Sequence, residues 1–174
     1  MSFDAFMYSP THKAIIPGET QDDAMASHGA FELLSFELGA ENVINIGSIT
    51  GGGGAGKATF KEFTVTKKTD TASTGLFHAL VTGQHFDDMI IELRRSGGDS
   101  AASGKTFMKF EFRLVMVQDI SWSGSDGDDV CEETVVFQFG AIEISYMKQD
   151  KQGKMQAPEV KRWSRVKNNA SLTV

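Results

Sequence analysis

The glycine-rich segment Gly51-Gly52-Gly53-Gly54-Ala55-Gly56-Lys57-Ala58 nearly matches the phosphate-binding pattern G-x-x-x-x-G-K-[ST]. Ala58 stands where that pattern needs a hydroxyl for magnesium, and residues 60–67 alternate like a strand instead of opening a helix. The sequence therefore argues against nucleotide binding. It leaves two interpretations: a flexible glycine loop, or an arm that orders only against another subunit, because ordering a free glycine run costs much entropy.

Other residues with chemical potential do not form recognisable sites. The four histidines lack zinc-ligand spacing, and the acidic segment 126–133 lacks the alternating ligands of a calcium loop. Asp87 and Asp88 would point to opposite faces of a strand, and Cys131 has no marked basic neighbour to lower its pKa. We expect no catalytic residues, no metal site and no cofactor, and thus a protein that is not an enzyme.

Composition narrows the class of protein further. The chain has 174 residues, 40% hydrophobic, which suits one domain over residues 1–174. A net charge of −6 argues against nucleic acid and against an anionic membrane surface. No stretch is apolar enough for a membrane helix, and residues 1–10 do not resemble a signal peptide. We therefore expect folding in the cytoplasm and, if the protein leaves the cell, export without a cleaved signal.

Period-two alternation dominates the chain and predicts strands. From Phe107 to Val117, one face carries Met108, Phe110, Phe112, Leu114 and Met116. Residues 88–95 and 60–67 alternate similarly, whereas 31–38 are apolar on both faces, as in a strand covered on both sides. The apolar parity of 135–146 changes at Gly140-Ala141, which predicts a β-bulge. The fold class is mainly β: a small β-barrel or two-sheet sandwich with one short α-helix.

That helix is expected over about residues 73–82, with Thr71 or Ser73 as N-cap and Gly83 as the stop. Its apolar residues cover a wide arc that leaves only His78 and Thr82 outside. An arc this wide predicts two contacts, one with the chain's own barrel and one with a neighbouring subunit. The residues expected at the subunit interface are Leu76, Phe77, His78 and Leu80.

Taken in order, these pieces resemble the haemolysin-coregulated protein (Hcp) family over nearly the whole chain. The matching segments are Phe3–Tyr8, Ile16–Glu19, Phe31–Gly39, the glycine run ending in Ala55-Gly56-Lys57, Phe63–Asp70 leading into the helix, Gly83–Phe86, Ile90–Gly98 and Lys161–Ser164. Gly75 departs from the pattern, because a better helix former would be usual there.

The resemblance implies a subunit that forms six-membered rings, which stack into the inner tube of the bacterial type VI secretion system and are expelled with the spike. Implied partners are further copies of the chain, spike and sheath components, and effector proteins carried in the ring lumen. The extended loop at about 46–58 is then the ring-stacking element, through Gly51, Gly52, Gly53, Gly54, Gly56 and Lys57. Ser35 and Glu37, on the opposite parity from Leu34, Phe36 and Leu38, are the residues expected in the lumen.

Two alternatives remain open at the level of sequence. A phage tail-tube-like subunit shares the same physics and would be distinguished by its assembly partner. A monomeric β-barrel binding module would be a stable monomer with an apolar pocket.

Overall fold

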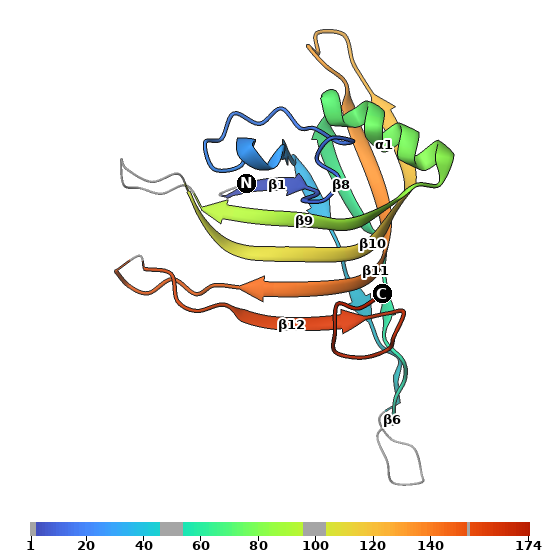
Figure 1. Ribbon diagram of the computed structural model, residues 1–174, viewed down its shortest axis with the longest axis vertical. Coiled ribbons are helices and arrows are strands. Elements are labelled where there is room, and N and C mark those ends of the chain that lie inside the picture. The colour runs from blue at the N-terminus through green and yellow to red at the C-terminus, as the bar shows by residue number, and fades with distance from the viewer. Residues whose placement is uncertain (1–2, 46–53, 96–103, 153) are drawn as a thin grey trace.

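The computed structural model describes residues 3–45, 54–95, 104–152 and 154–174. These ranges are mostly β-structure with one α-helix and one 3-10 turn, which confirms the predicted class (Figure 1). The elements in chain order are β1 (Asp4–Tyr8), η1 (Ala26–His28), β2 (Phe31–Glu32), β3 (Ser35–Glu37), β4 (Ala40–Glu41), β5 (Ile44–Asn45), β6 (Gly54–Ala55), β7 (Thr59–Phe60), β8 (Phe63–Lys68), α1 (Thr71–Thr82), β9 (His85–Arg95), β10 (Lys105–Ser123), β11 (Glu132–Tyr146) and β12 (Glu159–Ser164).

One antiparallel sheet forms the body of the molecule, with strand order β2-β1-β9-β10-β11-β8-β3. The long strand β11 pairs with β8 along its first half and with β12 along its second half. The strands curl strongly around the core, and α1 lies across one end of the sheet (Figure 1). Two short ladders, β4 with β7 and β5 with β6, lie outside this sheet.

The two ends of the strand order meet at one bent segment. β2 and β3 lie at opposite ends of the order but are separated in the chain by only Leu33 and Leu34. The Leu33 N–H donates to Ala5 O at 2.8 Å, and the Leu34 N–H donates to Thr66 O at 2.7 Å. The prediction of a single strand covered on both sides over 31–38 is wrong: the strand breaks here, and Leu34 is exposed.

Strand β10 turns over part-way along its length, so that the opposite set of alternate side chains faces the core. Phe110 and Phe112 belong to the core, and so do Val115 and Val117, so the inward parity changes between them. Leu114 lies at the change with φ 51°, a left-handed conformation that is uncommon for a residue other than glycine. The prediction that one face of β10 continues to Met116 is therefore wrong beyond Arg113.

Strand β11 changes face at the same level. Phe139 and Ile142 both lie in the core, which confirms the parity change predicted at Gly140-Ala141. The ladder register with β10 is unaltered there, so no extra residue is inserted and the predicted bulge is wrong. A Cβ on Gly140 would lie about 3.1 Å from the Leu114 Cβ, which explains glycine opposite the turnover. A register shift does occur further along β10, between Val117 and Asp119.

Stacked aromatic rings fill the centre of the core. The Phe63 ring stacks on Phe112 at 4.1 Å and on Phe137 at 4.7 Å between centroids, and Phe139 meets Phe112 edge-on at 5.0 Å. Each fully buried Phe contributes roughly 1.5–3 kcal/mol through removal of apolar surface from water. Helix α1 adds Ala72, Leu76 and Ala79 to the same core.

Candidate assembly surfaces

Helix α1 begins with a capping box at Asp70. The Asp70 carboxylate accepts from the Ala72 N–H at 2.9 Å, and the Asp70 N–H donates to Ser73 Oγ at 3.0 Å. The N-cap is therefore Asp70 and not Thr71 or Ser73. The helix ends at Gly83, whose φ of 69° is the left-handed conformation that favours glycine, as predicted.

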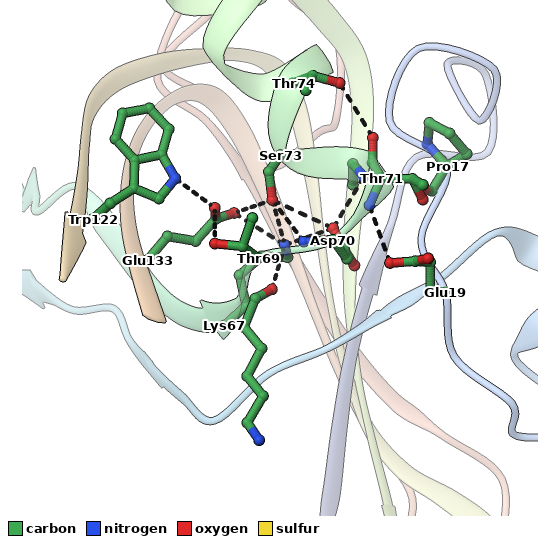
Figure 2. Close-up of polar contacts among 12 residues, drawn as sticks. Pro17, Glu19, Lys67, Thr69, Asp70, Thr71, Ser73, Thr74, Trp122 and Glu133 are labelled. Carbon is green, nitrogen blue, oxygen red and sulfur yellow. Dashed lines mark hydrogen bonds and ion pairs between the residues drawn. The ribbon is translucent and has the colours of Figure 1, made fainter. Parts of the chain in front are cut away.

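A buried lysine fastens this capping box to the sheet (Figure 2). Lys67, 0% exposed, donates from Nζ to Asp70 Oδ1 at 2.7 Å, to Glu133 Oε1 at 2.9 Å and to Ser73 Oγ at 3.1 Å. It also donates to the Lys68 carbonyl at 2.8 Å. The start of α1 is thus fixed to β8 and β11 by charge-assisted hydrogen bonds, which are stronger than neutral ones.

Glu133 carries the same network outward to the surface. This carboxylate, 1% exposed, accepts from Ser73 Oγ at 2.9 Å and from Trp122 Nε1 at 2.9 Å. The Trp122 ring in turn lies 6.1 Å from the Phe77 ring on α1. The buried ion pair and the exposed helix face are therefore linked through one indole.

The sequence itself contains a signal for this network. Lys67 shares its parity with Phe63 and Val65, and Glu133 shares its parity with Val135 and Phe137. Strand alternation therefore places two opposite charges on the inward face. Two buried opposite charges are rarely tolerated unless they pair, so a contact between β8 and β11 could have been inferred from them.

The outward face of α1 lacks acidic residues, lysine and arginine, and it exposes two large apolar side chains. Phe77 is 47% exposed, Val81 is exposed, and no Asp, Glu, Lys or Arg occurs in Thr71–Thr82. Of the predicted interface residues, Phe77 and His78 lie on the surface and Leu80 is partly buried. Leu76 is fully buried in this chain's own core, so it is not available to a neighbour. We call Phe77, Val81 and Trp122 the helix surface.

A second apolar area lies where β10 and β11 turn over. Leu114 and Met116 border a hollow of about 350 Å³ together with Gln138, Phe139, Gly140, Arg165 and Val166. Arg165 forms part of the wall, because its guanidinium donates to Phe139 O at 2.8 Å and Gln138 Oε1 at 3.2 Å. We call this hollow the C-terminal groove.

The segment predicted as a glycine loop is, where described, a two-stranded ribbon. β4 pairs with β7, β5 pairs with β6, and the Gly56 N–H donates to Val43 O at 2.9 Å. The ribbon projects away from the body of the molecule (Figure 1). Gly54 lies in β6 and Lys57 lies near Trp163, whereas Gly51, Gly52 and Gly53 lie outside the described residues.

The structure around Lys57 also bears on nucleotide binding. The segment continues into strand β7 at Thr59 and not into a helix. A P-loop needs a helix N-terminus at this point to bind phosphate. The near-match at 51–58 therefore lacks the context that the chemistry requires.

The two residues expected to face a lumen lie side by side in β3. Ser35 and Glu37 are exposed, while Phe36 between them packs against the core, so their predicted common parity is confirmed. Ser35 exchanges a hydrogen bond with Thr66 of the neighbouring strand β8. Glu37 is a negative charge on an exposed strand face.

Within residues 3–45, 54–95, 104–152 and 154–174, no three His, Cys, Asp or Glu side chains gather as metal ligands. No helix in these ranges is long and apolar enough to span a membrane. Cys131 is exposed and forms no disulfide.

Comparison with known proteins identifies the family. The family model described as "Type VI secretion system effector, Hcp" matches residues 6–146. The chain belongs to the Hcp family. It is therefore a type VI secretion system protein, from a family of structural, secreted components and not of enzymes.

Individual Hcp relatives agree in sequence and in structure. Protein hcp1 of Pseudomonas aeruginosa is 25% identical over 113 residues, covering 65% of this chain and 68% of the relative. The solved structure of a type six secretion system protein is 30% identical with a TM-score of 0.85, covering 97% of this chain and 99% of the other. Hcp1 from Salmonella typhimurium shares the fold at 23% identity and a TM-score of 0.71, covering 98% and 100%.

Proposed function

We propose that this Hcp chain is the ring-forming subunit of a type VI secretion inner tube. Six copies close into a ring, and rings stack into a hollow tube that is expelled with the spike. The tube would contact spike and sheath components, and effector proteins could travel in the ring lumen. In this proposal the chain folds in the bacterial cytoplasm and leaves without a cleaved signal.

The outward face of α1 is the observation that carries ring formation. A helix that faces only water normally carries charged residues there, yet this one carries none and exposes Phe77 and Val81. The capping box and the buried Lys67–Glu133 pair hold the helix rigidly. A rigid surface that exposes large apolar side chains and lacks Asp, Glu, Lys and Arg suits a permanent contact between subunits.

The ribbon β4–β7 supports the stacking of rings. It projects from the body, so it can reach a ring above or below (Figure 1). Deleting Gly51 to Gly54 removes Gly54 from β6 and leaves the buried core residues in place, so we expect rings to persist while tubes are lost. Intact tubes in the deletion variant, seen by electron microscopy, would contradict this role.

The exposed face of β3 supports contact with cargo in the lumen. Glu37→Arg reverses one exposed charge without disturbing Phe36 beneath the strand. We expect the variant to assemble normally and to change the retention of a co-expressed effector at least several-fold. Unchanged co-purification of every effector tested would argue against Glu37 in the lumen.

The first experiment is light scattering coupled to size-exclusion chromatography, followed by negative-stain microscopy of the peak. A species of six chains with a central hole is the expected result. A monomer at all concentrations would refute the ring and favour a monomeric binding module.

A further inference from the structure

We propose that the helix surface of one copy docks into the C-terminal groove of the next copy in the ring. This inference rests on the proposed ring and specifies which two surfaces form it. The groove is lined by Leu114, Met116, Phe139, Gly140 and Val166, and the helix surface is Phe77, Val81 and Trp122.

The two surfaces lie on opposite faces of the same strand. Met116 points away from the core. Trp122 is six residues further along the strand, so regular alternation would make it point the same way, but a register shift follows Val117. The shift reverses the parity, so Trp122 points toward Glu133 and α1 instead. A contact between two different surfaces is head-to-tail, and a closed ring needs contacts of this kind. In a two-fold dimer, by contrast, each copy would use the same surface.

The groove is large enough to receive side chains of the helix surface. The helix presents Phe77 and Val81 one turn apart on a convex ridge. The groove has a volume of about 350 Å³. Since an apolar cavity of roughly 150 Å³ accommodates a benzene molecule, the groove has room for a phenyl ring and a smaller aliphatic side chain.

Acidic residues lie beside the helix surface. The β10–β11 hairpin, which rises beside α1 in Figure 1, exposes acidic residues. They are Asp126, Asp128, Asp129 and Glu132. Cys131 O of this hairpin accepts from the Thr69 N–H, which ties the acidic rim to the start of the helix region.

Basic residues lie at the groove on the turn that follows β12, where Arg165 lines it and Lys167 follows the lining residue Val166. Lys167 is exposed, and Arg165 is bonded to neutral acceptors, so its charge is not cancelled. Arg162 is already paired with Glu143. An acidic rim facing a basic rim speeds the encounter of two copies and favours one orientation, and this complementarity selects a second copy of the chain as the occupant.

The test uses two full-length variants that each block one surface, Phe77→Asp and Met116→Asp. These side chains are 47% and 42% exposed, so both variants should keep the wild-type circular dichroism spectrum. Each variant should elute as a monomer in size-exclusion chromatography, because each has lost one of the two surfaces that form the contact. An equimolar mixture should yield a dimer of one copy of each, since only one intact pair of surfaces remains. Val43→Asp, on the ribbon and 74% exposed, is the control that should keep rings.

Charge exchange provides a second test. Asp128→Lys with Asp129→Lys should weaken assembly at least tenfold at low salt. Adding Lys167→Glu to the same chain should restore part of the assembly.

The outcomes separate this inference from the proposed function. Wild-type rings together with rings in both blocking variants would overturn the docking while leaving the ring intact. Monomeric variants that fail to form the mixed dimer would overturn the pairing of these two surfaces. A wild-type chain that stays monomeric would overturn the proposed function and this inference together.

Discussion

Replacing Lys67 by Met should destabilise the fold more than any surface substitution in the same strand. The lysine is completely buried and bonds to Asp70, Ser73 and Glu133. Methionine has a similar length, so packing changes little. The change leaves the Glu133 carboxylate, itself 1% exposed, without its cationic partner.

The size of the expected loss of stability depends on the hydrogen bonds that Glu133 keeps in the variant. Breaking a buried pair by removing one partner costs about 3–5 kcal/mol. Glu133 keeps hydrogen bonds from Ser73 Oγ and Trp122 Nε1, which soften the loss. We therefore expect the free energy of unfolding to fall by about 3 kcal/mol, at the lower end of that range. Lys68→Met, an exposed neighbour, is the matched control and should change it by less than about 0.5 kcal/mol.

Urea unfolding followed by circular dichroism measures both variants. It should be run at two protein concentrations, because subunit assembly adds a concentration-dependent contribution to stability. Fluorescence should also report a change around Trp122, whose indole bonds to Glu133. A Lys67→Met variant within about 1 kcal/mol of wild type would refute the view that this network anchors the helix.

Two further substitutions test other contacts. Gly75→Ala should lower the free energy of unfolding by at least about 2 kcal/mol, because a Cβ there would collide with the Ile15 carbonyl. This loss should exceed the gain from alanine's better helix propensity. Thermal melting that shows equal or higher stability would contradict this. Burial, and then the charge of Glu92, raise the pKa of Tyr8 above its ordinary 10.0. The folded state therefore keeps the Tyr8 proton when the unfolded state loses it, so wild type should lose up to about 1.4 kcal/mol per pH unit above pH ~10 relative to Tyr8→Phe. Parallel stability curves between pH 9 and 11 would be the contrary result.

Sequence patterns predicted those features that depend on local periodicity. Strand alternation identified the long strands, and Gly83 marked the end of the helix because a left-handed residue is required there. The parity change near Gly140 was also visible, since apolar residues on both sides of it recorded the change. The family resemblance rested on the same ordered set of local patterns.

Features that depend on distant contacts were not predictable from periodicity. Leu114 gives no sign in its residue type of a positive φ, so the turnover of β10 was missed. Leu76 and Phe77 belong to one apolar arc, and only the docked helix shows that the core takes Leu76 and leaves Phe77 exposed. Asp70 was overlooked as the cap because it lies outside the apolar pattern that located the helix.

The bent segment that joins both ends of the sheet has a consequence for how the chain folds. The β9–β10–β11 meander can form through neighbouring strands, whereas pairing of β1 with β9 brings together residues as distant as Asp4 and Arg94. Closing so long a loop has a large entropic cost, so we expect this step to come late. Until β1 pairs with β9, the β1–β2 end of the sheet is not joined to the β9–β10–β11 meander, and the sheet stays open at β9. The newly synthesised chain would therefore pass through an open-edged intermediate, a state in which strands of different chains can pair wrongly.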